Sequence, residues 1–173
     1  MENITKRRLV MRTDLFGEEH LEPLDVARKA IEMSLDYPFY KIKTYHSGVT
    51  FFDDNNERVN LSSEYGLYAI YKDKICLYVG ETFSSIYYRV YRFQKELLGL
   101  SRPDENHAAA LKARMDGIKD LHNCKIRFIP HHVVLEEIDK VDSDYRRLYG
   151  HFPLDEYVAP LLEAKYNTRK VHM

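Results

Sequence analysis

The hydrophobic positions of this chain fall into short stretches that have either a helical or a strand periodicity. Apolar residues between Leu24 and Leu35 recur every three to four positions, which predicts a helix that Pro23 opens and Pro38 ends. The segments Tyr40–His46 and Val49–Phe52 have the pattern of short strands. The first third of the chain is therefore expected to contain one helix followed by extended segments.

The clearest strand pair comes next, at Gly66–Tyr71 and Ile75–Gly80, and an amphipathic helix is expected at Ser85–Leu98. The stretch Val133–Tyr149 is ambiguous, and its second half is expected to be helical. The other predicted elements are a helix capped by Asp104 and running to Ile118, a strand at Cys124–Ile129, and a last helix from Pro153 toward Tyr166. This order predicts an α+β domain with a small central antiparallel or mixed sheet flanked by helices.

The composition fits one folded domain without a membrane segment. The chain has 173 residues and 45% hydrophobic residues, so it can build a core. No run approaches the roughly 18 apolar residues of a membrane span, and the charged start lacks a secretory signal, so a cytoplasmic protein is expected. Cys76 and Cys124 fit no zinc or redox spacing and are expected to be buried free thiols.

The two central strands bring tyrosines and glycines together. If the hairpin is centred on Asp73, Tyr68 faces Tyr78 and Gly66 faces Gly80, although a bulge would shift this register by one residue. Two phenols would then lie side by side, and two glycines would allow close approach to the backbone. The simpler interpretation is a tyrosine-rich strand pair that only packs well.

Two charged residues on the predicted helices extend this constellation. Arg89 lies at the edge of the apolar stripe of its helix and can reach the tyrosine face, where its planar guanidinium would suit a phosphate. Glu156 lies off the apolar stripe of the last helix, next to small residues that leave room for a metal or phosphate, and Pro160 should kink that helix. Alone, each is more simply explained as a solvated surface residue.

Together these residues resemble the GIY-YIG nuclease superfamily. The two half-motifs match Gly66-Leu67-Tyr68 and Tyr78-Val79-Gly80, followed by Arg89, by Glu156 and by Asn167, over about residues 65–168. Members of that family usually carry a histidine or tyrosine one turn after the arginine, and this chain has Phe93 there. Either Tyr91 or a residue from elsewhere replaces it, with His107 as the candidate substitute, or that role is absent. The resemblance implies a catalytic domain at residues 65–173 with a helical insertion at about 99–122, preceded by an extension at 1–64 that is a candidate DNA-recognition element.

The resemblance also implies a chemistry. Glu156 would bind one divalent cation, Mg²⁺ being the expected ion, and Tyr68 would orient or deprotonate the attacking water. Tyr78 would hydrogen-bond the phosphate or the water network, and Arg89 would hold the nonbridging oxygens, while Asn167 would brace the last helix. The other residues expected to contact nucleic acid are Arg92, Lys165, Arg169 and Lys170.

The expected activity is that of an endonuclease acting on double-stranded DNA in a prokaryotic or phage-infected cell. A compact type II restriction enzyme is favoured. Such an enzyme is expected to act as a homodimer or higher symmetric oligomer, because cutting both strands with one site per chain requires two copies. A nicking enzyme of loose specificity and a non-catalytic binding module with this fold remain as alternatives. The net charge of −1 does not by itself favour nucleic acid, so a local positive face is required.

Overall fold

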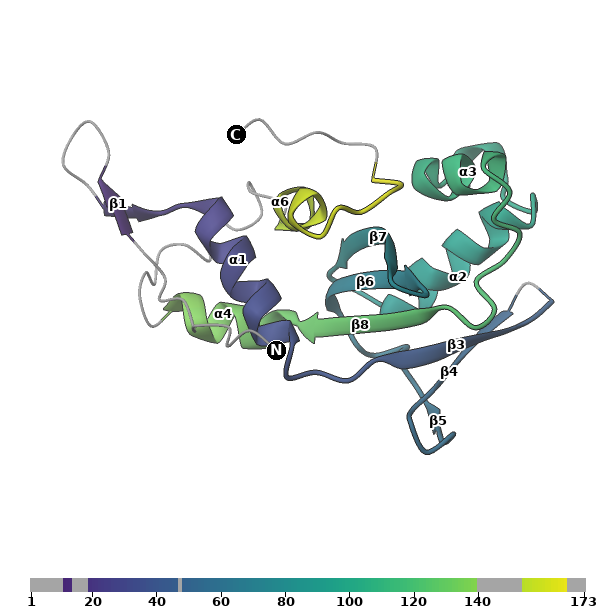
Figure 1. The fold of residues 1–173 in the computed structure, drawn as a ribbon, viewed down its shortest axis with the longest axis horizontal. Coiled ribbons are helices and arrows are strands. Elements are labelled where there is room, and N and C mark those ends of the chain that lie inside the picture. Colours follow the sequence, from purple (N-terminus) through teal and green to yellow (C-terminus); the bar gives the residue numbers. More distant parts are fainter. Residues whose placement is uncertain (1–10, 14–18, 47, 140–153, 168–173) are drawn as a thin grey trace.

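A computed structural model describes residues 11–13, 19–46, 48–139 and 154–167 (Figure 1). Its helices are α1 (Pro23–Ser34), α2 (Ile86–Leu97), the short 3₁₀ helix η1 (Pro103–Glu105), α3 (Ala108–Met115), α4 (His131–Asp139) and α6 (Leu154–Leu161). Its strands are β1 (Met11–Thr13), β2 (Glu19–Leu21), β3 (Tyr40–Tyr45), β4 (Gly48–Phe52), β5 (Arg58–Val59), β6 (Gly66–Lys72), β7 (Ile75–Thr82) and β8 (Lys125–Pro130).

A six-stranded antiparallel sheet organises the described residues, with the strand order β5-β4-β3-β8-β6-β7. This confirms the predicted α+β class with a small antiparallel sheet. Strand β8 pairs with both β3 and β6, so the strands expected in the N-terminal extension belong to the same sheet as the central hairpin. Strands β1 and β2 form a separate pair.

Helices cover both faces of this sheet because its central strands have apolar residues on both sides. On one face, α2 and α3 pack over Tyr68, Ile70, Phe128 and the residues of β3 and β4 that share their core. On the other face, α1 and α6 pack over Leu67, Ala69, Val79 and Ile129 (Figure 1). Strands buried on both faces lose strict alternation of apolar and polar residues, as β6 shows.

The register of the β6–β7 hairpin differs from the predicted one. Lys72 pairs with Ile75 across a two-residue turn, and a bulge then shifts the pairing so that Tyr68 lies opposite Gly80 and Ile70 opposite Tyr78. The expected opposition of Tyr68 with Tyr78, and of Gly66 with Gly80, is therefore wrong. The bulge adds one residue to β7, which returns Tyr78 to the face of Tyr68 as its diagonal neighbour.

The region between α2 and β8 also differs from the prediction. The expected helix from Asp104 to Ile118 is wrong in its first part, since η1 covers Pro103–Glu105 and α3 starts only at Ala108, after the cap residue His107. The segment 131–139 is helical as α4, whereas the helix predicted for the second half of 133–149 lies outside the described residues. Helix α6 ends at Leu161, one residue after Pro160, instead of reaching Tyr166.

Within the described part of the chain, none of the helices has the length and apolar character needed to cross a bilayer.

Candidate active-site cleft

A polar cleft of about 350 Å³ lies between the end of β7, helix α2, the start of α3 and helix α6. It brings together residues that are far apart in the sequence and that the sequence singled out. Its polar lining consists of Tyr78, Glu81, Arg89, Arg92, Asn106, His107, Asp155, Glu156 and Asn167. The predicted candidates Tyr78, Arg89, His107 and Glu156 therefore share one cleft.

Of the two motif tyrosines, Tyr78 lines the cleft on the sheet side, whereas Tyr68, which was expected at the site, is not among the cleft-lining residues. Their ring centroids are 6.2 Å apart, and Tyr78 lines the cleft while Tyr68 is only 3% exposed beneath it. The end of the Tyr68 ring lies directly against Gly80, where any Cβ would approach Tyr68 Cε1 to 2.8 Å. Gly80 is thus required because the ring occupies the space of a side chain.

Burial determines the protonation state of Tyr68. It raises the pKa of the Tyr68 phenol well above its usual value, and the neighbouring Tyr78 raises it further, while Arg89 and Arg92 lower it by less. Desolvation therefore outweighs the effect of the two positive charges on this pKa. Tyr68 is a neutral phenol here, able to donate a hydrogen bond.

Helix α2 supplies the positive charge of the cleft. Ser85 caps its start by accepting the N–H of Tyr88, and the buried Ile86, Val90, Phe93 and Leu97 fix the helix on the sheet. This orientation places Arg89 and Arg92 on the side of the helix that faces the cleft. Two guanidinium groups one turn apart make this wall a natural binding surface for an anion.

His107 takes a specific tautomer because it caps α3. Its Nδ1 accepts the N–H of Ala110 at 3.3 Å, which leaves the proton of the neutral ring on Nε2. Burial, assisted by Arg92 and Arg89, lowers the pKa of His107 from 6.5 to about 4. Because Nδ1 already accepts a hydrogen bond and Nε2 carries the proton, the neutral ring can donate from Nε2 but is poorly suited to take up a second proton.

Phe93, where the resemblance leads one to expect a histidine or tyrosine, supports this wall. Phe93 is 1% exposed, and its ring lies 5.5 Å from Tyr78 and 4.8 Å from His107 between ring centroids. The rings of Tyr78 and His107 are themselves 5.0 Å apart. Phe93 thus packs behind both cleft residues, and His107 brings an imidazole to the cleft from the start of α3.

Helix α6 carries Glu156 on the opposite side of the cleft. Its buried Leu154, Val158 and Ala159 pack in the core that also contains α1 and β7 residues, which turns the half-buried Glu156 toward the cleft. After the helix, Asn167 accepts the N–H of Val79 at 2.9 Å and donates to the carbonyl of Val79 at 2.8 Å. Asn167 therefore fastens this segment to the outer edge of β7, between the two motif residues Tyr78 and Gly80.

The oxygen donors of the cleft suit a hard divalent cation. Glu156 and Asp155 offer carboxylates to the lining, whereas the oxygens of Glu81 and of the Asn167 amide are engaged by other groups of the protein. Among the residues that the structure describes, no group of three or more histidine, cysteine, aspartate or glutamate side chains could hold a metal ion together. A site of this kind fits an ion such as Mg²⁺, which one or two carboxylates bind while water and phosphate complete its shell.

Not every predicted residue reaches the cleft. The Lys165 ammonium lies 5.4 Å from the centroid of the Tyr166 ring, and Lys165 is not among the cleft residues. Arg169 and Lys170 lie outside the described residues. Gly66 makes a structural contact instead, because a Cβ there would lie 2.9 Å from Pro130 Cα on β8.

Sequence reasoning missed Glu81, Asp155 and Asn106 as cleft residues. The position of Glu81 directly after Gly80 was a usable signal, because a motif strand that ends at a site places its next residue there too. Asp155 adjoins Glu156 in the same way. Asn106 gave no signal, since it follows a 3₁₀ helix that the hydrophobic pattern does not specify.

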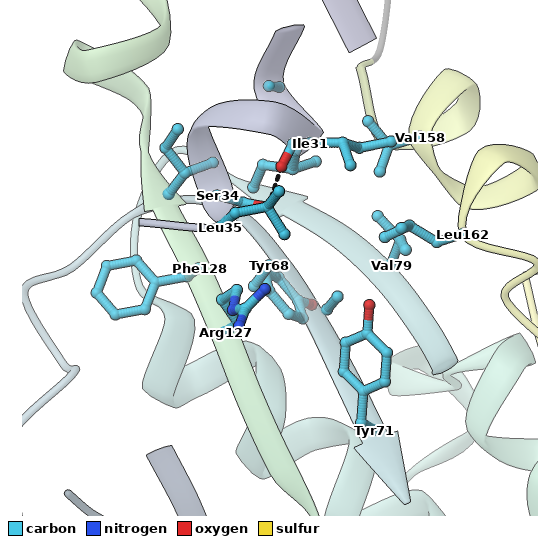
Figure 2. Close-up of a pocket in the computed structure, with 14 residues that line it drawn as sticks. Ile31, Ser34, Leu35, Tyr68, Tyr71, Val79, Arg127, Phe128, Val158 and Leu162 are labelled. Atoms are coloured by element: carbon cyan, nitrogen blue, oxygen red, sulfur yellow. Dashed lines mark hydrogen bonds between the residues drawn. The ribbon is translucent and has the colours of Figure 1, made fainter. Parts of the chain in front are cut away.

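A second, apolar hollow of about 90 Å³ lies on the other face of the sheet, between α1, α6, β6 and β8 (Figure 2). Its lining includes Ile31, Val79 and Leu162, and its polar residues are Arg127, Tyr68, Tyr71 and Ser34. The Arg127 guanidinium lies 3.8 Å from the centroid of the Phe39 ring. None of the described residues that line this hollow carries a carboxylate, so it lacks the oxygen donors that the polar cleft offers a cation.

Comparison with protein-family models, with curated proteins and with solved structures found no match to this chain. The residues of the polar cleft are therefore what supports a function for it.

Proposed function

We propose that this chain is a metal-dependent phosphodiesterase that cuts DNA at the polar cleft. One observation carries this proposal: Tyr78, Arg89, His107 and Glu156 come from four separate segments and line the same cleft. A cleft with cationic donors on one wall and a carboxylate on the other matches the two needs of phosphodiester hydrolysis, which are charge stabilisation and an oxygen site for a cation.

The arginines of α2 would bind the scissile phosphate. Arg89 is exposed to solvent at the cleft and can donate two parallel hydrogen bonds to nonbridging oxygens. Arg92 lies one turn further along the same wall. As negative charge grows on the phosphate, fixed cationic donors stabilise it more than the ground state, which lowers the barrier.

Tyr78 would hold and orient water, and the buried Tyr68 would support its ring from below instead of removing a proton from water. Tyr68 is neutral because burial raises its pKa, and Tyr78 lies over it at the cleft surface. A phenol hydroxyl donates and accepts hydrogen bonds, so Tyr78 can position an attacking water against the phosphate. His107 would donate from Nε2 to a phosphate oxygen.

Glu156 would hold the divalent cation, assisted by water and by phosphate oxygens. When bound, the cation neutralises phosphate charge and makes its bound water easier to deprotonate. The negative charges of Asp155 and Glu81 in the same lining favour such a cation electrostatically.

DNA is the proposed substrate because the arginines of α2 supply the local positive face that the net charge of −1 does not. Cutting at defined sites by a symmetric oligomer is proposed as the form of the activity, as in a restriction enzyme. Random nicking would instead indicate an enzyme of loose specificity, and tight binding without cutting would indicate a non-catalytic module.

The test is incubation of supercoiled plasmid and genomic DNA with the protein and Mg²⁺, in parallel with excess chelator. Cleavage that requires Mg²⁺ and is lost in Glu156→Gln, while that variant still binds DNA, is the expected result. Exposed Glu57→Gln, on the distant turn before β5, serves as the matched control and should cut normally. Full cleavage by Glu156→Gln, or cleavage in chelator, contradicts the proposal.

A further inference from the structure

The residue after the second half-motif makes two specific contacts. Glu81 lines the cleft, yet its side chain is only 6% exposed. Its Oε2 lies 2.9 Å from Nε2 of His131, and its Oε1 accepts the backbone N–H of Leu154 at 3.2 Å. Both carboxylate oxygens are therefore engaged by groups from other elements.

These contacts join the start of α6 to the sheet. Leu154 is the first residue of α6, two residues before Glu156, and Glu81 belongs to β7. The first N–H groups of a helix have no partner within the helix, so a carboxylate that accepts one fixes where the helix begins and also interacts favourably with its dipole.

His131 in turn fixes the carboxylate. Its side chain is 2% exposed at the junction of β8 and α4, where its backbone N–H donates to the carbonyl of Tyr65 at 3.3 Å. Its ring stacks on Phe83 with centroids 4.2 Å apart and planes inclined by 23°. A buried ring held on two sides leaves Glu81 little freedom to rotate.

Resting on the proposed function, we propose that Glu81 is a positioning residue that, with His131, sets the start of α6 and so places the Glu156 carboxylate for the cation. Glu81 acts on the cation through the helix and not as its ligand. Groups that orient a metal ligand in this way commonly change metal affinity 10- to 100-fold when removed.

The matched variants are Glu81→Ala and Glu81→Gln. Alanine removes both contacts. Glutamine removes the negative charge but keeps an oxygen that accepts the Leu154 N–H, and its amide donates to His131 Nε2 in the tautomer whose proton is on Nδ1. If Glu81 anchors α6, the alanine variant should lose cation affinity and the glutamine variant should keep it. If Glu81 is instead a direct cation ligand, both variants should lose cation affinity.

Two measurements decide between these roles, on the full chain without DNA. The first is the affinity for Mn²⁺ by electron paramagnetic resonance, and the second is the hydrogen exchange rate and chemical shift of the Leu154 amide by NMR. Glu81→Ala should weaken Mn²⁺ binding about tenfold or more and release the Leu154 amide, while Glu81→Gln stays within about twofold of wild type in both. Should the alanine variant not fold, Glu81→Asp takes its place, because its shorter side chain cannot span both partners.

The proposal is overturned if Glu81→Ala leaves either the Mn²⁺ affinity or the exchange rate and chemical shift of the Leu154 amide unchanged. It is also overturned if Glu81→Gln binds Mn²⁺ as weakly as Glu81→Ala does. Failure of the proposed function looks different: the wild-type chain would then neither bind Mn²⁺ nor cut DNA. In that case the Leu154 amide still decides whether Glu81 anchors α6.

Discussion

Replacing Gly80 by alanine should damage the cleft through one steric contact. A Cβ at residue 80 would lie 2.8 Å from Tyr68 Cε1 and closer still to Cζ and the hydroxyl oxygen, whereas ordinary contact begins at 3.4 Å. The ring must therefore move by more than half an ångström. Tyr68 is 3% exposed in the core below Tyr78, so it has no solvent space into which it can move.

The energetic consequence follows from two opposing effects. Overpacking in a buried site costs about 1–3 kcal/mol. Replacing glycine with alanine restricts the unfolded chain, which stabilises the folded state by only about 0.4–1 kcal/mol. Gly80→Ala should thus lower the free energy of unfolding by about 1–2 kcal/mol. Because a misplacement of about 1 Å near reacting groups can cost on the order of 10²-fold in rate, cleavage should fall more than stability suggests.

Denaturant unfolding and single-turnover cleavage of plasmid DNA measure the two effects. Gly48→Ala is the control, because a Cβ at residue 48 would meet only the Tyr45 carbonyl at 3.3 Å and lies outside the cleft. In a Tyr68→Leu background the Gly80→Ala penalty should disappear, since the ring end is gone. Unchanged stability and rate in Gly80→Ala, or a penalty that persists in that background, would refute the steric explanation.

Three further outcomes follow from the cleft. His107→Asn keeps a capping oxygen but removes the imidazole whose pKa is lowered to about 4. Because the unfolded chain binds a proton at His107 more tightly than the folded protein does, the wild type should lose on the order of 3 kcal/mol of unfolding free energy as the pH falls from 6.5 to 4. The variant should keep this stability, as denaturation at each pH would show. Asn167→Ala loses both bonds to Val79 and should cost about 1–3 kcal/mol in thermal unfolding, with an unchanged melting temperature contradicting this. Arg89→Lys keeps the charge but not the planar fork, so cleavage should fall about 10²-fold while plasmid binding changes little, and equal rates would remove Arg89 from the chemistry.

The sequence predicted most of the fold because its hydrophobic periodicity is strong where the elements are long. The helix from Pro23 and the strand pair at residues 66–80 follow directly from apolar spacing and turn residues. The register of that hairpin did not follow, since a single bulge depends on how both faces of β7 pack. The helix predicted to start at Asp104 was wrong for a related reason. Pro103 begins a 3₁₀ helix there, and α3 starts only after its cap residue His107.

The candidate site was predictable only in part. Glu156 and Arg89 stood out as charged residues at the edges of apolar stripes, and the structure places both at one cleft. The contacts of Glu81 with His131 and Leu154 join positions 50 and 73 residues apart, and no local pattern marks such pairs. The raised pKa of Tyr68 could not be predicted from the sequence, because burial, which dominates that pKa, is a property of the folded core.

The most direct test of the central claim locates a cation in the cleft without any substrate. Fe²⁺ replaces Mg²⁺, and ascorbate with peroxide then generates hydroxyl radicals that cut the backbone next to the bound ion. Fragments should end near Glu156, Glu81 and Asn106, segments that meet at the polar cleft, and they should vanish with excess Mg²⁺ or in Glu156→Ala. Cuts elsewhere on the chain, or an unchanged pattern in Glu156→Ala, would contradict the assignment of Glu156 as the residue that holds the cation.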